Sequence, residues 1–248
     1  RSIFDRFGQR MIESWLKYAP HIPLTLYVEG FLLPQALESK VHQISISATG
    51  FREFARLCEG HPERSGLIAD STTVGRPKWQ VQLENGEPYQ FRLDALKFSR
   101  KSLAVTDWCM AERSDIVLYL DADTELRRRL EPSDMLEMMP HAADLAILKR
   151  NAMYPESGIY MVNLRARGLE YARAFRDLYL SGKIFELEQW HDGWLLGWIV
   201  DDMQLNVASL SGAGATTSRP VENGPLGKWF THVKGLERKA KYGRERMI

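Results

Sequence analysis

Residues 115–126 read DIVLYLDADTEL, an apolar run that stops at two aspartates, Asp121 and Asp123. The run is strand-sized and rich in branched and aromatic side chains, which predicts a buried β-strand. Where such a strand ends in a turn, carboxylates at positions i and i+2 can converge on one cation. Mg²⁺ and Mn²⁺ prefer oxygen ligands and complete their shells with substrate phosphates, so the pair indicates a metal-held nucleotide. The alternative is a pair that only forms and caps the turn.

The chain has 248 residues, of which 44% are hydrophobic, enough for a sizeable core. This length allows one sizeable α/β domain or two small ones, and we expect a single domain over residues 1–248. No apolar run reaches the roughly 18 to 20 residues of a membrane-spanning helix, and no signal peptide is recognisable, so no membrane association is expected. Cys58 and Cys109 lie far apart without metal-binding spacing, which predicts two small buried hydrophobes in a reducing, cytoplasmic setting.

The charge of the chain is unevenly distributed. The net charge is only +1, but residues 228–248 carry seven basic against two acidic side chains, a local excess of five. This basic C-terminal segment favours phosphate-bearing partners, whereas a merely solvated surface is the alternative interpretation.

Helices and strands are expected to alternate along most of the chain. Expected helices occupy residues 4–18, 51–60, 93–112 and 168–181, and a helix or turn is expected over residues 131–138. Expected strands occupy residues 24–30, 42–47, 115–120, 144–148 and 158–164. Gly, Pro, Ser and Thr concentrate between about residues 60 and 90, which predicts a long irregular insertion, and YPESG is a turn signal before the last strand. The alternation predicts an α/β fold with a mainly parallel sheet flanked by helices, whose ligands bind at the carboxyl ends of strands.

Three segments carry a family resemblance and span about residues 91–239. They are FRLDALKFSRKSLAVTDWCMAERSDIVLYLDADTEL (91–126), SGIYMVNL (157–164) and THVKGLERK (231–239). Together they resemble nucleotide-sugar glycosyltransferases of the GT-A fold, in which a helix bearing Lys or Arg precedes an apolar strand ending in DxD. A strand with a G-x-x-x-x-N element and a C-terminal His-x-x-Gly with basic residues then follow. The resemblance implies a GT-A, Rossmann-like fold and transfer of a sugar from a nucleoside-diphosphate donor, a UDP-sugar, to an acceptor hydroxyl.

The resemblance also implies which residues hold the metal. Asp121 would lie near the ribose and the metal, Asp123 would ligate the metal directly, and His232 would add a ligand from the C-terminal loop. The ion would be Mn²⁺ or Mg²⁺, which neutralises the charge that develops on the leaving diphosphate. A histidine in a loop is more often merely solvated, and only the HVKG context singles out His232.

Further cations are candidates for binding the diphosphate. Asp94, Lys97 and Lys101 fall at positions i, i+3 and i+7 of an expected helix and so share one face. One interpretation is a solvated stripe of salt bridges. In the other, Lys97 or Lys101 reaches the diphosphate, and Asp94 orients it or contacts the nucleoside. Lys234 and Lys239 follow His232 and could close over the bound donor on a flexible loop.

Residues 187–202, LEQWHDGWLLGWIVDD, form a tryptophan-rich segment. Trp190, Trp194 and Trp198 repeat every four residues, which is typical of a helix face packed in a core, although sugars also stack on such rings. The resemblance places an acidic residue at a helix start in this part of the fold. In an inverting reaction that residue, Asp192, would deprotonate the acceptor hydroxyl, whereas a retaining reaction needs no such base.

The chain departs from the GT-A pattern at its N-terminal end. GT-A domains begin with a strand that contacts the nucleobase and is followed by a helix like FGQRMIESWLKY. Here the helix is expected almost at residue 1, so either that strand is missing from this chain or the nucleotide site is built differently.

Two other functions compete with glycosyl transfer. A haloacid-dehalogenase-like phosphatase would use the first aspartate of the pair as a nucleophile, with Asp201 and Asp202 as a poor second acidic pair. A non-catalytic nucleic-acid-binding module would use the basic tail and exposed aromatic rings. Within the glycosyltransferase interpretation the acceptor is a glycan or hydroxymethylated DNA. The sequence leaves open the sugar, the nucleobase, the stereochemical outcome and the oligomeric state.

Overall fold

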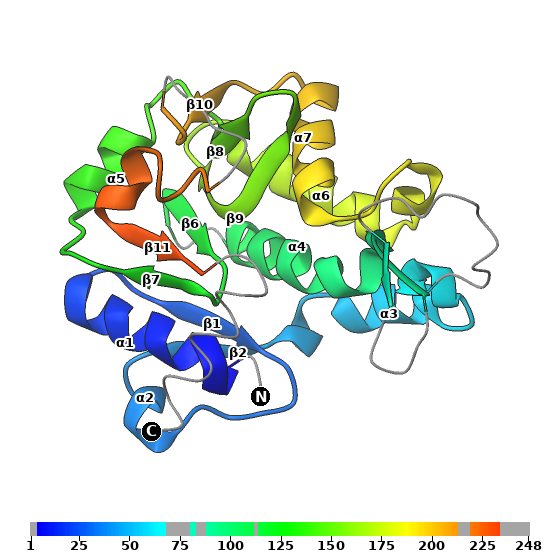
Figure 1. The fold of residues 1–248 in the computed structure, drawn as a ribbon, viewed down its shortest axis with the longest axis horizontal. Helices are drawn as coiled ribbons and strands as arrows, with labels where there is room; N and C mark the ends of the chain where they lie inside the picture. Colours follow the sequence, from blue (N-terminus) through cyan, green and yellow to red (C-terminus); the bar gives the residue numbers. More distant parts are fainter. Residues whose placement is uncertain (1–3, 68–79, 83–87, 112–113, 213–218, 234–248) are drawn as a thin grey trace. The chain divides into compact units, whose positions relative to one another are not determined.

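The computed structural model describes residues 4–67, 80–82, 88–111, 114–212 and 219–233 (Figure 1). The chain divides into two compact units, each built from separate stretches of sequence. The first comprises Arg1–Ser45, Ser114–Gly168 and Leu205–Ile248, and the second comprises Ile46–Arg113 and Leu169–Gln204.

The described part of the first unit contains three sheets and several helices. Its helices are the π-helix η1 (Phe4–Gly8), α1 (Gln9–Tyr18), α2 (Gln35–Glu38), α5 (Pro132–Met138) and the 3₁₀-helix η5 (Pro225–Lys228). Its strands are β1 (Thr25–Val28), β2 (His42–Ser45), β6 (Ile116–Leu120), β7 (Thr124–Leu126), β8 (Leu145–Arg150), β9 (Met153–Asn163), β10 (Val207–Ser209) and β11 (Phe230–His232).

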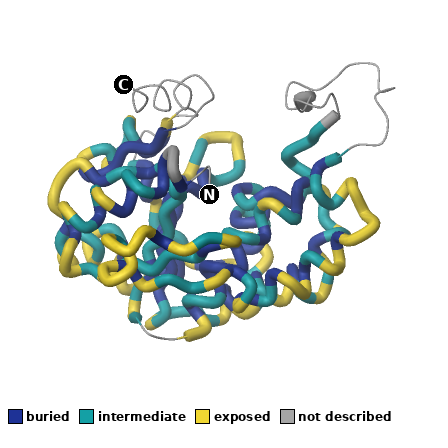
Figure 2. The backbone as a smooth tube through the Cα atoms, turned by 90° about the horizontal axis from the view of Figure 1, so that it is seen from below, coloured by how far each residue is buried: buried dark blue, intermediate teal, exposed yellow. Residues whose placement is uncertain are grey.

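The largest sheet of this unit has the order β10-β8-β9-β6. Strand β9 is antiparallel to both of its neighbours, whereas β10 and β8 are parallel, as are β1 and β2 in a separate pair. The expected α/β class is confirmed, but the expectation of a mainly parallel sheet holds only for these two parallel pairs. The first four residues of β8 and the last eight of β9 are buried, as fits strands in the interior of a sheet. Figure 2 shows the buried stretches of the described chain in dark blue.

The antiparallel pairing of β8 and β9 follows from the short connection between them. Only Asn151 and Ala152 separate the two strands, and Ala152 has a φ of 53°, as is usual in tight hairpins. The YPESG segment, expected to be a turn, instead lies within β9. A two-residue connection cannot bring a strand back in parallel, since a parallel crossover needs a dozen or more residues.

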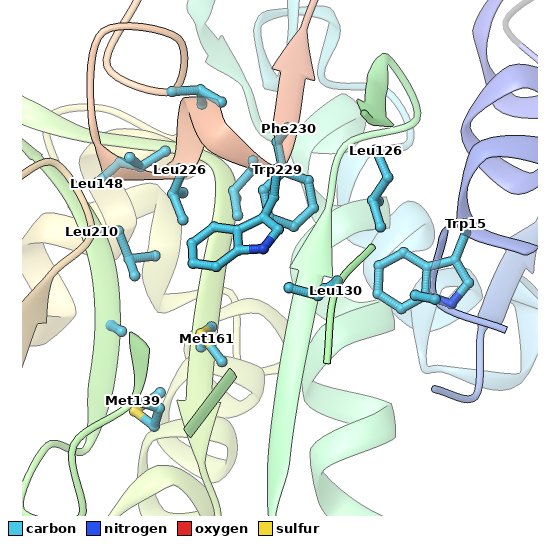
Figure 3. Packing of buried hydrophobic residues seen from close by; sticks show 14 of the residues in the cluster. Trp15, Leu126, Leu130, Met139, Leu148, Met161, Leu210, Leu226, Trp229 and Phe230 are labelled. Carbon is cyan, nitrogen blue, oxygen red and sulfur yellow. The ribbon is translucent and has the colours of Figure 1, made fainter. Parts of the chain in front are cut away.

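The core of the first unit draws on residues that are distant in sequence. Trp15 of α1, Leu126 of β7, Met161 of β9 and Phe230 of β11 belong to one buried cluster (Figure 3). Figure 3 shows Trp229 beside them, and it is only 4% exposed. Because each large buried ring contributes much of the stabilisation, the C-terminal strand is part of this core and not an appendage to it.

The second unit, in its described residues, is mainly helical with one small sheet. Its helices are the 3₁₀-helix η2 (Ile46–Ala48), α3 (Phe51–Cys58), the 3₁₀-helix η3 (Pro62–Arg64), α4 (Ala95–Met110), α6 (Gly168–Leu180), the 3₁₀-helix η4 (Lys183–Glu186) and α7 (Asp192–Asp202). Its strands are β3 (Ser65–Leu67), β4 (Gln80–Gln82) and β5 (Pro88–Asp94), which form an antiparallel sheet in the order β3-β5-β4.

An irregular insertion is expected over residues 60–90. The described residues of this range instead contain η3, β3, β4 and the start of β5. The expected helix from residue 93 also begins later, because β5 continues to Asp94 and α4 starts at Ala95. The alternating pattern of YQFRLD is typical of a strand, and this strand continues to Asp94, the residue that caps α4.

Both cysteines are free and buried, as expected from the sequence. Burial raises the pKa of Cys58 to about 11 and that of Cys109 to about 12. The thiolate is the reactive form. We expect iodoacetamide at pH 8 to alkylate the folded protein at least about 100-fold more slowly than the urea-unfolded protein. Mass spectrometry of timed samples checks this, and rapid labelling of either cysteine in the folded state would contradict it.

Among the described residues, no helix is long and apolar enough to cross a membrane.

Candidate functional site

The first aspartate of the DxD pair is fixed by the sheet. Asp121 follows β6, and its amide donates a hydrogen bond of 2.8 Å to the carbonyl of Gly158 in β9. The chain then turns, because the amide of Thr124 donates back to the carbonyl of Asp121 at 3.0 Å. Both aspartates therefore sit on a short turn between β6 and β7, with their backbone held at both ends.

His232 lies on β11, the strand that pairs with the one following this turn. Strand β11 pairs antiparallel with β7, and His232 lies opposite Thr124, the residue that follows Asp123 (Figure 1). The amide of Val233 donates a hydrogen bond of 2.9 Å to the carbonyl of Asp123. Two short strands thus bring together residues that are 109 positions apart.

The three side chains form a compact cluster of possible metal ligands. The Nε2 atom of His232 lies 3.1 Å from Oδ1 of Asp123 and 4.0 Å from Oδ2 of Asp121. One ligand atom from each residue lies within 4.8 Å of the others. The side chains of His232 and Asp123 are 6% and 12% exposed, whereas that of Asp121 is 32% exposed. The cluster is therefore closed on the protein side and reachable from solvent at Asp121.

The donor set fits a hard divalent cation. Two carboxylates this close repel each other, and a cation that contacts both removes the repulsion. Carboxylate oxygens suit Mg²⁺ and Mn²⁺, and an imidazole nitrogen is a common additional ligand for first-row transition ions. Water or a phosphate oxygen can complete the shell on the side of Asp121. Mn²⁺ fits this mixed set better than Mg²⁺, which rarely takes nitrogen ligands.

A tyrosine that was not among the predicted residues orients Asp121. The hydroxyl of Tyr119 donates a hydrogen bond of 2.7 Å to Oδ1 of Asp121, and the Tyr119 ring packs against Tyr160 with centroids 5.3 Å apart. The other carboxylate oxygen of Asp121, Oδ2, is the one nearer His232. Alternation along β6 places Tyr119 on the same face as Asp121, so the i−2 position was the available signal.

A glycine makes room for the cluster. A methyl group built on Gly158 would lie 2.6 Å from Cε1 of His232 and 3.1 Å from Oδ2 of Asp121. Contacts below 3.0 Å force a neighbour to move, so the imidazole can occupy its position only because residue 158 has no side chain. The sequence resemblance includes this glycine in SGIYMVNL but does not predict its steric role.

A buried ion pair lies just before Gly158 in the β8–β9 hairpin. A guanidinium nitrogen of Arg150 lies 3.5 Å from Oε2 of Glu156, and the two side chains are 7% and 10% exposed. Arg150 also donates to the carbonyl of Tyr154 at 2.9 Å. Burial lowers the pKa of Arg150 from its ordinary value, although the group stays charged at neutral pH.

In the second unit, the predicted base contacts one of the lysines that were predicted to bind the diphosphate. The ammonium of Lys101 in α4 lies 2.7 Å from Oδ2 of Asp192, and the side chains are 11% and 16% exposed. Asp192 is the first residue of α7, where a carboxylate is favoured by the positive end of the helix dipole. His191 caps the same helix and accepts a hydrogen bond from the amide of Trp194. A charged lysine is thus held next to the carboxylate that was predicted as the base.

Asp94 does not lie on the predicted helix face. It precedes α4 as its N-cap, and its Oδ1 accepts a hydrogen bond of 2.9 Å from the amide of Lys97. Its Oδ2 accepts one of 2.6 Å from the hydroxyl of Tyr89. Burial, followed by this hydrogen bond, raises the pKa of Tyr89, so the phenol remains a donor. Capping accounts for Asp94, and a role toward the donor stays a prediction.

The tryptophan segment is only partly a helix. Trp190 precedes α7, and its indole nitrogen donates to the carbonyl of Leu187 at 3.0 Å while its ring packs against Phe185. Trp194 and Trp198 are within α7 and are partly buried. The expected stripe of three rings on one helix therefore contains two. Lys234 and Lys239 lie outside the described residues.

Comparisons with known proteins give only distant likenesses. No family model matches the chain, and no curated protein matches it. The glycosyltransferase GlyE of Streptococcus pneumoniae TIGR4 is similar at a TM-score of 0.43 and 15% identity, over 82% of this chain but only 42% of GlyE. Mouse xyloside xylosyltransferase 1 gives 0.45 and 12%, over 85% of this chain and 80% of that one. The galactosyltransferase LgtC, solved with donor and acceptor sugar analogs, gives 0.45 and 13%, over 98% and 92%.

Proposed function

We propose that the protein is a metal-dependent glycosyltransferase of the GT-A type, which moves a sugar from a nucleoside-diphosphate donor, a UDP-sugar, to an acceptor hydroxyl. The observation that carries the proposal is the cluster of Asp121, Asp123 and His232. The sequence resemblance names these same three residues from two distant segments, and the pairing of β7 with β11 supports their acting together.

In this proposal the cluster holds Mn²⁺ or Mg²⁺, which supplies charge neutralisation for the leaving diphosphate. Asp123 and His232 would hold the ion from the buried side, and Asp121, whose Oδ2 is the oxygen nearer His232, would hold it from the more exposed side. Lys97 and Lys101 are candidates for the diphosphate oxygens, together with Lys234 and Lys239.

Asp192 is the proposed base for an inverting reaction. It would accept the proton of the acceptor hydroxyl as that oxygen attacks the anomeric carbon. Lys101 stabilises the ionised form that a base requires, at a contact of 2.7 Å. Assigning Asp192 to the same reaction as the metal cluster rests on the sequence resemblance, because the two groups belong to different units.

The proposed acceptor is a glycan hydroxyl. The DNA alternative depends on basic residues from Lys234 onward, and these lie outside the described residues. The phosphatase alternative is not favoured, because the third member of the carboxylate cluster is His232 and not a second acidic pair. Asp201 and Asp202 are instead exposed at the end of α7.

Thermal unfolding with UDP, GDP and ADP, each with and without Mn²⁺, tests the proposal. We expect UDP with Mn²⁺ to stabilise the fold by about 2.7 kcal/mol at 100 times the dissociation constant, and UDP alone to have little effect. Asp123→Asn should abolish the stabilisation, because it removes a charged ligand while keeping the side-chain shape. Asp115→Asn is the matched control, because Asp115 lies just before β6, the strand that Asp123 follows, but is exposed. It should leave the stabilisation by UDP with Mn²⁺ unchanged.

Other outcomes separate the alternatives. Stabilisation by no nucleotide under any condition would contradict the proposal. Hydrolysis of an aryl phosphate that depends on Asp121 would indicate a phosphatase, and a metal-independent shift of DNA would indicate a binding module. Hydrolysis of UDP-sugars by the protein with Mn²⁺ identifies the donor sugar once the nucleotide is known.

A further inference from the structure

A groove of about 430 Å³ lies in the second unit between residues of α6 and α7. Trp198, which is partly buried, is one of the residues that line it. Its polar lining is exposed and consists of Asp177, Ser181, Lys183 and Asp202. None of these residues belongs to the clusters described above, so the groove is a separate feature of the molecule.

The two carboxylates are placed where the fold alone disfavours them. Asp177 lies in the last turn of α6 and Asp202 is the last residue of α7. Neither helix has a basic residue in its last turn, and a carboxylate there is repelled by the negative end of the helix dipole. Among the described residues, neither carboxylate has an ion-pair partner. The groove thus holds two acids that do not stabilise the helices carrying them.

The mixture of groups selects the chemistry of a ligand. Carboxylates accept hydrogen bonds, the ammonium of Lys183 donates them, and the hydroxyl of Ser181 can do both. An alcohol group likewise both donates and accepts, so a molecule with several hydroxyls can use the whole set. An organic cation would use the carboxylates only and would be repelled by Lys183. Trp198 is the aromatic residue of the lining, and an indole ring offers an apolar face on which a sugar ring can stack.

We propose that this groove binds a sugar ring of a neutral saccharide, with one face of the ring against Trp198 and its hydroxyls bonded to Asp177, Asp202 and Lys183. The binding itself is independent of the metal cluster. That the bound saccharide is the acceptor rests on the proposed glycosyl transfer.

Titration with lactose, maltose and cellobiose, followed by ligand-observed NMR, tests the binding. We expect at least one disaccharide to bind, Trp198→Leu to abolish binding, and Trp198→Phe to retain most of it, because phenylalanine keeps an aromatic face. Trp194→Leu is the matched control, since Trp194 is a partly buried ring on the same helix that does not line the groove. It should leave binding unchanged.

Replacing the two carboxylates should change disaccharide binding and the unfolding temperature in opposite directions. We expect Asp177→Asn and Asp202→Asn each to weaken disaccharide binding at least about tenfold and to raise the unfolding temperature. A lower unfolding temperature with unchanged binding would show that the acids are structural and would overturn the proposal. So would equal binding by Trp198→Leu and the natural protein, or binding of spermidine in place of every disaccharide.

The two proposals fail separately. Stabilisation by UDP with Mn²⁺ should persist in Trp198→Leu, because the groove shares no residue with the metal cluster. If a disaccharide binds but no nucleotide stabilises the protein, the saccharide-binding proposal stands and the glycosyltransferase proposal fails. If UDP with Mn²⁺ stabilises the protein but no disaccharide binds, the glycosyltransferase proposal stands and the saccharide-binding proposal fails.

Discussion

Replacing Gly158 by alanine is expected to weaken Mn²⁺ binding by about 10- to 100-fold, the range found when a group that supports a metal ligand is changed. The added methyl would lie 2.6 Å from Cε1 of His232. The imidazole is nearly enclosed, so it must rotate or shift as a whole, and its Nε2 then leaves the position beside Asp123. Isothermal titration with Mn²⁺ measures the affinity directly.

The same substitution should also cost stability, by about 1–3 kcal/mol for an overpacked buried site. The informative control repeats Gly158→Ala in a His232→Ala background, in which the space beside residue 158 is already open. There the stability cost measured by urea unfolding should largely disappear, although Mn²⁺ binding stays lost. An equal cost in both backgrounds would show that the clash is with some other group and not with the imidazole.

The second large effect is expected in the hairpin that carries Gly158. Glu156→Ala should destabilise the protein by about 3–5 kcal/mol, the usual cost of leaving a buried charge without its partner. Arg150 is the charge left behind, and its side chain is only 7% exposed. Urea unfolding at 25 °C, monitored by circular dichroism, gives the change in unfolding free energy.

Two comparisons show whether burial causes this cost. The double variant Arg150→Met/Glu156→Leu removes both charges and should recover most of the lost stability, because an apolar pair of similar size needs no solvation. Asp115→Ala breaks the ion pair with Arg165, whose members are 61% and 60% exposed, and should cost less than about 1 kcal/mol. A cost as small for Glu156→Ala as for Asp115→Ala would contradict the buried-charge explanation.

Local sequence patterns predicted the elements that carry the candidate site. The apolar run before Asp121 forms β6, because a strand pattern depends on neighbouring residues. The family resemblance, and not a local pattern, placed Asp192 at a helix start, and α7 begins at that residue. Asp94 illustrates the limit of a periodic pattern. The spacing to Lys97 suited a shared helix face, but the same carboxylate serves equally well as a cap one residue before the helix.

Local sequence patterns could not predict which strands pair or which residues distant in sequence come into contact. The antiparallel position of β9 depends on where the chain turns, and Asn151–Ala152 is a weaker turn signal than the YPESG that follows it. The steric role of Gly158 depends on His232, which lies on a different strand. Only the resemblance linked His232 to the aspartates, because the pairing of β7 with β11 is a contact between distant parts of the chain.

The position of β11 has a consequence for biosynthesis. A chain emerging from the ribosome completes Asp121 and Asp123 long before Phe230 and His232 are made, and domains generally fold as units during synthesis. Until the last segment arrives, the first unit lacks both a buried ring of its core and the third member of the carboxylate cluster. The proposed cation site and the core of the first unit are therefore completed in the same late step of synthesis.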